Sequence, residues 1–281
     1  MSRSALILAA HGSDAEPEAN ARLSEFADRI AHRDLFDKVA IAFHRGEPTF
    51  ATVLDQLDAD EVTVVPVMTS DGYYCDEVLP RELRKNRRHT QIRLRITPPV
   101  GAHPGIISLV EQRMRRLILD YNLAADDVCV AVVGHGTPRH PRSRLATEQL
   151  AETLQRVVPC NEVLHAFLDE DPGVETIPGR TSRGAILVIP FLISSGPHAT
   201  VDIPRRLELG TTTRATPPVS GWIGNRFVVC DVAIGAHPEI VDLIVGLATS
   251  GRHEQASDRP SQDSPDRALE RRQLVASVEA S

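Results

Sequence analysis

Three residues in the second half of the chain carry side chains that bind metal ions and transfer protons: His135, Asp169 and His198. His135 directly follows the apolar stretch "VCVAVVG", Asp169 comes two residues after Phe167, and His198 follows "AILVIPFLI" and a Ser-Ser-Gly-Pro turn. Two imidazoles and a carboxylate suit a divalent first-row metal with open coordination positions. The histidines are also candidate catalytic groups, because imidazole titrates near neutral pH.

Each of these residues alone has a simpler interpretation. A His-Gly pair after a strand is most often a turn that meets an anion or water. Asp169 lies in "LDEDP", where a run of acids is commonly a solvated loop, and His198 could be a packed core histidine. The joint occurrence of all three at strand ends favours the metal-site interpretation, since clusters of His and Asp mark metal or catalytic sites.

The segments around these residues predict an α/β fold. Short runs rich in Val, Ile and Leu ("ALILAA", "KVAIAF", "EVTVVPV", "IRLRITPPV") have the pattern of buried strands. Amphipathic segments of helical length lie between them. This alternation predicts parallel sheets flanked by helices, whose ligands bind beyond the carboxyl ends of the strands.

An internal repeat divides the chain into two lobes. His135 lies 124 positions after His11, and "VVPVMTSDGYYCDEVLP" matches "VIPFLISSGPHATVDIP" at the same offset. The offset becomes 134 at the two "GAHP" motifs, which places an insertion between Arg205 and Cys230. We expect lobes at residues 1–124 and 125–250. The polar residues 251–281 predict a disordered tail.

The first copy differs at the three positions of interest, where it has His11, Arg45 and Tyr74. An arginine cannot ligate a metal and repels it electrostatically. We therefore expect a degenerate site in this lobe, with these three residues on the substrate side: Arg45 and Tyr74 as contacts, and His11 as either a remnant or an auxiliary proton acceptor. The histidines of the "GAHP" motifs, His103 and His237, are assigned to the starts of helices at the prolines that follow them.

Composition excludes several classes of function. A net charge of −7 gives no support for nucleic-acid binding. The four cysteines form no CxxC pair, so zinc ribbons and iron–sulfur sites are disfavoured. The sequence has no signal-peptide pattern and no apolar run of membrane-spanning length. We expect a soluble cytoplasmic protein that binds neither nucleic acid nor membranes.

The motifs resemble those of the class II tetrapyrrole chelatases of the sirohydrochlorin cobaltochelatase or ferrochelatase type (CbiX/SirB). The resemblance rests on "HGS", on an upstream "GHG", on "AF" with an acid two residues after Phe, and on the P-x5-G-x-H-x3-D-I-P stretch. It covers residues 5–248. It implies a bilobal chelatase fold with a cleft between the lobes. It also implies ATP-independent insertion of Co2+ or Fe2+ into sirohydrochlorin, with the metal held by His135, Asp169 and His198.

The chain departs from this family in two respects. An aspartate, Asp169, stands where the family has glutamate, and the complete set lies in the C-terminal lobe while the N-terminal lobe is degenerate. No cofactor beyond the substrate metal is expected. We expect a sirohydrochlorin-like tetrapyrrole as the partner and leave the oligomeric state open, with a monomer as one possibility.

A polycarboxylate substrate needs cations in an acidic protein, and arginines pair well with carboxylates. The alternative for each arginine is a solvent-exposed helix charge. The predicted substrate-binding set also includes two serines of the loop before His198, and its further members are Arg139, Arg142, Arg144, Ser194, Ser195, Arg205 and Arg206.

Two other functions fit the same residues. A non-catalytic tetrapyrrole or metal carrier would retain the site without turnover. An enzyme of another α/β family could use the His-Gly loops on phosphate esters, but the chain has no P-loop and no GxGxxG motif.

Overall fold

The computed structural model confirms the predicted α/β class with two mainly parallel sheets. Both sheets belong to one compact unit, residues 1–248. The structure describes residues 2–13, 17–137, 140–158, 162–194, 196–209 and 218–250, with only the backbone for residues 17–19. The predicted disordered tail lies outside the described residues. The lobe boundary between residues 124 and 125 stays a prediction.

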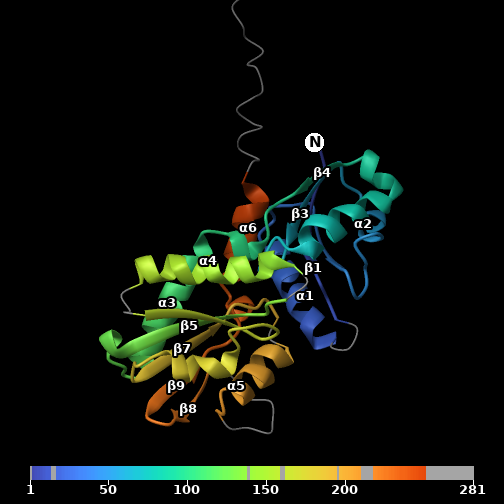
Figure 1. Ribbon diagram of the computed structural model, residues 1–281. Coiled ribbons are helices and arrows are strands. Elements are labelled where there is room, and N and C mark those ends of the chain that lie inside the picture. Colours follow the sequence, from blue (N-terminus) through green and yellow to red (C-terminus); the bar gives the residue numbers. More distant parts are fainter. Residues whose placement is uncertain are drawn as a thin grey trace, which may run out of the picture. The chain divides into compact units, whose positions relative to one another are not determined.

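The first sheet has four parallel strands in the order β2–β1–β3–β4 (Figure 1). Its strands are β1 (Ser4–Ala10), β2 (Lys38–Phe43), β3 (Glu61–Pro66) and β4 (Arg93–Ile96). The central strands β1 and β3 are almost continuously buried. Apolar runs without alternation are what a parallel sheet covered on both faces requires.

The second sheet repeats this order as β6–β5–β7–β9 and adds an antiparallel edge strand, β8. Its strands are β5 (Val128–Gly134), β6 (Glu162–Phe167), β7 (Ala185–Pro190), β8 (Val219–Ile223) and β9 (Arg226–Cys230). β8 lies within the segment where the change of offset predicts an insertion. The inserted residues therefore extend the sheet at its edge and leave the order of the four equivalent strands unchanged.

The principal helices among the described residues are α1 (Pro17–Ala31), α2 (Leu79–Lys85), α3 (Gly105–Asp120), α4 (Pro141–Val157), α5 (Ile203–Arg206) and α6 (Ile240–Thr249). The two helices after the "GAHP" motifs begin slightly later than the sequence predicts. Pro104 is the N-cap of α3, and α6 begins two residues after Pro238. In α3 the ring of His103 accepts a hydrogen bond from the Gly105 amide (2.9 Å), which satisfies one N–H of the first turn. In the described residues, no helix is long and apolar enough to cross a bilayer.

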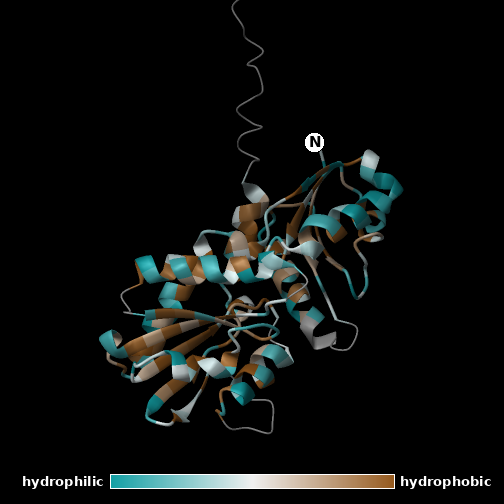
Figure 2. Cartoon of the chain, in the orientation of Figure 1, coloured by the Kyte–Doolittle hydropathy of each residue, from teal (hydrophilic) through white to brown (hydrophobic). Residues whose placement is uncertain are grey.

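Three apolar clusters cover the faces of the sheets. One cluster belongs to the first half alone and one to the second half alone. The third and largest combines residues of both halves, including Leu8, Met114, Val130 and Ile244. Figure 2 shows the strands as mainly hydrophobic, whereas α4 mixes hydrophilic and apolar residues. The shared cluster makes residues 1–248 a single packing unit.

The last helix of each half packs against the other half. Arg113 on α3 forms a bidentate ion pair with Asp231, which follows β9 (3.0 and 2.7 Å). Arg95 on β4 donates to the carbonyl oxygens of Leu247 and Ala248 at the end of α6. Figure 1 shows α3 beside β5 and β7, and α6 near β3. The two repeats therefore exchange their C-terminal helices.

Ending the chain after Gly251 should leave its thermal unfolding midpoint unchanged. α6 is complete at Thr249, and residues 252–281 have too little apolar content to bury a face. Thermal unfolding followed by circular dichroism of the full-length and shortened chains checks this. A fall of more than about 4 °C, equivalent to roughly 1–2 kcal/mol in a domain of this size, would show that the tail packs against the rest.

Candidate functional site

The carboxyl ends of three neighbouring strands supply the predicted metal ligands. β5 lies between β6 and β7 in the second sheet. His135 follows β5 directly, Asp169 follows β6 by two residues, and His198 begins the π-helical turn η7 (His198–Asp202) after β7. Adjacent parallel strands end on the same edge, so these side chains are brought together from positions up to 63 residues apart.

The three side chains are within contact range of one another. His135 Nδ1 lies 3.3 Å from Asp169 Oδ2, and the rings of His135 and His198 meet edge to face with centroids 5.0 Å apart. In the part of the chain that the structure describes, no group of three or more His, Cys, Asp or Glu side chains has the arrangement of a metal cage. The residues are therefore gathered without forming a closed ligand shell, and the three-ligand set stays a prediction.

Hydrogen bonds assign the tautomers of the two histidines. His135 Nδ1 lies 2.9 Å from the carbonyl oxygen of Gly136, and His198 Nδ1 lies 2.8 Å from Asp202 Oδ2. Carbonyl and carboxylate oxygens only accept, so each Nδ1 carries the proton and donates it. The lone pair of each neutral ring is then on Nε2. Both imidazoles are thus oriented through Nδ1 and offer Nε2 as a ligand or a base.

The site is open to solvent. The exposed fractions of the side chains are 43% for His135, 54% for Asp169 and 55% for His198. A structural metal site is normally closed, whereas a site that exchanges its metal keeps open positions. The half-exposed imidazoles leave room for a large ligand.

Glycine is required after each of the first histidines of the two halves. Gly12 and Gly136 adopt φ angles of 71° and 70° in the left-handed region. A Cβ on Gly12 would lie 2.0 Å from the carbonyl oxygen of Arg45, and one on Gly136 would lie 2.7 Å from Glu170 Cγ. The "HG" motif is therefore fixed by backbone conformation and by the close approach of the loop from the next strand.

The equivalent edge of the first sheet carries an aromatic cluster. His11 follows β1, and Tyr74 begins the π-helical turn η2 (Tyr74–Val78) after β3; their rings are 4.4 Å apart. His44, after β2, lies 5.4 Å from His11 and 4.9 Å from Tyr74, measured between centroids. Arg45 is exposed and forms no ion pair with any described residue.

Two residues of these clusters are missed by the sequence analysis. His44 is aligned with Leu168 by the repeat, so comparison of the halves gives no sign of it. Burial lowers the pKa of His44, and the neighbouring His11 and Arg45 lower it further. Asp202 orients His198 and is visible in the sequence only as part of the "DIP" motif. A search for acids at position i+4 from each helical histidine would have found it.

Four arginines of the predicted substrate-binding set are paired with protein acceptors: Arg142, Arg144, Arg205 and Arg206. Arg142 contacts Asp71 and Asp76 of the first half. Arg205 donates to Asp202 (2.9 Å). The other pairs are Arg144 with Glu148 and Glu170, and Arg206 with Glu175. A substrate carboxylate must compete with these partners, so their role in binding stays a prediction.

The two predicted serines differ in what can be said of them. Ser194 Oγ accepts a hydrogen bond from the Gly196 amide (3.1 Å) and stabilises the turn before His198. Ser195 and Arg139 lie outside the described residues.

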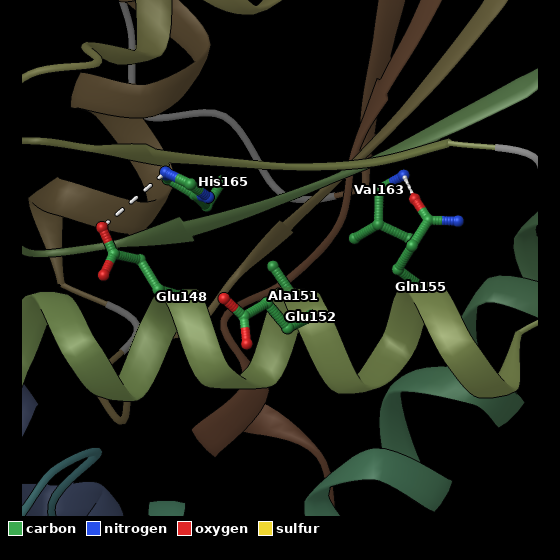
Figure 3. A pocket seen from close by; sticks show the side chains of 6 residues that line it. All are labelled: Glu148, Ala151, Glu152, Gln155, Val163 and His165. Atoms are coloured by element: carbon green, nitrogen blue, oxygen red, sulfur yellow. Dashed lines mark hydrogen bonds and ion pairs between the residues drawn. The ribbon is translucent and has the colours of Figure 1, made fainter.

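A separate hollow of about 410 Å3 lies between α4 and β6 (Figure 3). None of the predicted site residues lines it. Gln155 Oε1 accepts from the Val163 amide (2.7 Å), and Glu148 lies 3.9 Å from His165 Nε2, as the dashed lines show. Burial lowers the pKa of His165. The hollow is distinct from the strand-end site.

Comparisons with known proteins identify a family and related chains. The family model described as CbiX matches residues 5–117 and 129–249. A curated relative from Halobacterium salinarum, named "Probable sirohydrochlorin cobaltochelatase", is 29% identical over 264 residues, which cover 87% of this chain and 90% of the relative.

Solved structures show the same fold. SirB from Bacillus subtilis with Fe3+ matches with a TM-score of 0.72 at 21% identity, covering 90% of this chain and 98% of that one. A multi-domain protein from Deinococcus radiodurans, described as structurally similar to chelatases, matches with a TM-score of 0.69 at 25% identity. The match covers 92% of this chain and 56% of the Deinococcus chain. The matched family model spans most of both halves, and the chain belongs to the CbiX family.

Proposed function

We propose that this chain inserts a divalent metal ion, Co2+ or Fe2+, into sirohydrochlorin without ATP. The observation that carries the proposal is the pair of half-exposed imidazoles, His135 and His198, each anchored through Nδ1 with Nε2 left as the lone-pair atom. The family membership and the name of the Halobacterium relative support the choice of substrate. The cytoplasmic location and the monomeric state stay predictions.

A chelatase must hold its metal loosely enough to hand it on. Two Nε2 atoms on an open edge provide few protein ligands, and the remaining positions are available to water and then to the macrocycle nitrogens. Asp169 lies against Nδ1 of His135, where its charge favours binding of a cation and keeps the ring oriented. Nitrogen ligands of this kind accept both Co2+ and Fe2+.

Metal insertion releases two protons from the pyrrole nitrogens. As the M2+ ion leaves the imidazoles for the macrocycle, the freed Nε2 lone pairs become available to accept those protons. Imidazole is the side chain that most often accepts and releases protons in catalysis. The same two side chains thereby serve as metal donors and as bases.

The first half would bind the macrocycle itself. Arg45 is exposed and is not paired with another described residue, so it can capture a carboxylate without breaking an ion pair. Tyr74 and His44 form an aromatic surface beside it. Burial lowers the pKa of His44, and His11 and Arg45 lower it further. A neutral imidazole suits contact with a flat apolar ring.

The direct test mixes sirohydrochlorin with Co2+ or Fe2+, with and without the protein, and follows the visible spectrum of the macrocycle. Faster conversion with protein than without it supports a chelatase. Binding of both ligands with no acceleration for either metal would support the alternative, a tetrapyrrole or metal carrier.

Replacing Arg45 or Asp169 by alanine should separate the two binding functions. Arg45→Ala should weaken binding of metal-free sirohydrochlorin about 10-fold, the effect of losing one hydrogen bond to a charged group, and leave Co2+ binding unchanged. Asp169→Ala should do the reverse, because it removes the carboxylate beside His135. The measurement is a pair of titrations on each variant, one with Co2+ alone and one with the macrocycle alone.

Arg115→Ala is the control for a lost positive charge, since Arg115 pairs only with Glu111 on the same exposed face of α3 among the described contacts. It should change neither titration. Equal losses in both titrations for Arg45→Ala would contradict the division of labour between the halves.

A further inference from the structure

The His-Gly loops of the two halves share a backbone conformation but are fixed by different side chains. In both loops the histidine Nδ1 bonds the next carbonyl oxygen (3.0 Å for His11, 2.9 Å for His135). In both loops, the carbonyl oxygen of the histidine accepts a hydrogen bond from an amide just after the next strand. The donors are the amides of Arg45 (2.8 Å) and Asp169 (3.0 Å). The third residue of each loop, Ser13 or Thr137, is where the two halves diverge.

In the first half, one asparagine holds this residue. Asn20 Oδ1 accepts from the Ser13 amide and Asn20 Nδ2 donates to the Ser13 carbonyl oxygen, both at 3.1 Å. Asn20 is the fourth residue of α1. The facing residue is Gly46, with φ of 130°, and a Cβ there would lie 3.2 Å from Asn20 Nδ2. Glycine suits this positive φ and leaves room for the Asn20 side chain.

In the second half, the fourth residue of α4 is Arg144, which has no acceptor atom and cannot receive the Thr137 amide. Glu170, which the repeat aligns with Gly46, accepts this amide instead, through its Oε1 at 3.0 Å. Its other oxygen, Oε2, accepts from Nε and Nη2 of Arg144 at 3.1 and 3.0 Å. An Arg–Glu pair therefore replaces the Asn–Gly pair.

The guanidinium of Arg144 has further partners besides Glu170. Arg144 also donates to Glu148 (3.0 Å) and to the carbonyl oxygen of Asp171, and its Cζ lies 4.6 Å from the ring centre of Phe167. The side chain of Glu170 is only 14% exposed. A partly shielded carboxylate held by a two-pronged arginine has a fixed orientation. Neither side chain contacts the metal ligands directly, but Glu170 adjoins Asp169, and Thr137 is two residues from His135.

We propose that Arg144 and Glu170 are positioning residues that hold the loop from His135 to Thr137, and with it the imidazole, in the orientation for metal transfer. This inference rests on the proposed function for its catalytic consequence, whereas the loop restraint itself does not depend on that function. Because the two halves use alternative pairs at equivalent positions, the second half should accept the pair of the first.

The experiment compares full-length variants by two measurements. The first is the hydrogen-exchange rate of the Thr137 amide, followed by NMR, which requires neither metal nor macrocycle. The second is a titration with Co2+ alone, followed by its visible absorption. The variants are Glu170→Gln, Glu170→Gly, Arg144→Asn and the double variant Arg144→Asn with Glu170→Gly. Arg115→Asn, in an exposed pair on α3, is the matched control.

Glu170→Gly should accelerate exchange of the Thr137 amide and weaken Co2+ binding on the order of 10-fold, the usual cost of losing a group that orients a metal-binding histidine. Arg144→Asn should weaken binding less, because Glu170 can still accept from Thr137. Glu170→Gln should stay within about threefold of the wild type, because its amide oxygen still accepts. The double variant should recover slow exchange and Co2+ affinity relative to Glu170→Gly.

Rapid Thr137 exchange in the double variant, or wild-type exchange in Glu170→Gly, would overturn the proposal. If the double variant fails to fold, Glu170→Gln decides: loss of slow exchange in that variant overturns it, and retention supports it. If the wild-type chain neither binds Co2+ nor accelerates insertion, the proposed function fails, while the exchange rates still decide the role of Arg144 and Glu170.

Discussion

Replacing His135 or His198 by alanine is expected to lower the rate of metal insertion by at least about 100-fold, the lower bound for losing a positioned acid–base group. Each substitution also removes one of the two Nε2 atoms that would carry the ion. The measurement is the initial rate of the spectral change with sirohydrochlorin and Co2+, at several concentrations of the metal. Raising the metal concentration should not restore the rate completely, because the base is lost as well.

His103→Ala is the control among the histidines. Its ring caps the first turn of α3 through the Gly105 amide, and none of its described contacts reaches His135, Asp169 or His198. The variant should therefore insert metal within about twofold of the wild-type rate. Wild-type rates for both His135→Ala and His198→Ala would refute the site. Loss of Co2+ binding in His11→Ala, with retention in His135→Ala, would move the working site to the first half.

The gathering of His135, Asp169 and His198 could be predicted because it depends on topology alone. Each residue follows an apolar run, and parallel strands that alternate with helices all end on one edge. The offset of 124 residues, set by duplication, also predicts equivalent sheets, and the shared order of strands confirms this. Neither inference needs side-chain detail.

Side-chain partners could not be predicted in the same way. The sequence suggests that arginines near the site are available to bind the substrate. In the structure, however, Arg142 forms an ion pair with Asp76, and Arg144 forms one with Glu170. His44 could not be predicted from the repeat, because the repeat aligns it with a leucine, Leu168. The Nδ1 contacts that leave the lone pair on Nε2 depend on rotamers, for which a sequence has no periodic signal.

The exchange of α3 and α6 between the halves could not be predicted either. Amphipathic spacing shows that a helix has an apolar face but not which sheet that face covers. The ion pair between Arg113 on α3 and Asp231 shows how the exchanged helix is fixed. Asp231 is completely buried, and His237 Nε2 lies 3.7 Å from its Oδ2. The "GAHP" histidine of the second half is therefore buried beside this carboxylate.

Asp231→Asn is expected to destabilise the protein by about 3 kcal/mol at neutral pH, because it leaves the guanidinium of Arg113 without its buried counter-charge. Arg113 is 25% exposed, so water recovers part of the loss and the lower end of the range applies. The free energy of unfolding from urea titrations of both chains measures the effect. Asp120→Asn is the control, since it breaks a largely exposed pair with Arg116 and should cost less than about 1 kcal/mol.

The difference between the wild type and Asp231→Asn should depend on pH. Burial alone would raise the pKa of Asp231, but the contacts with His237 and Arg113 outweigh it and hold the pKa below its ordinary value. A carboxyl group with a lowered pKa stabilises the fold above the pKa of the unfolded chain, about 3.9, and loses that contribution as the pH falls through the folded value. The stability difference should therefore be constant from about pH 7 to pH 5 and shrink below about pH 4. A difference that instead grows in acid would mean that Asp231 is protonated in the native protein, and that the exchanged helix is held by packing alone.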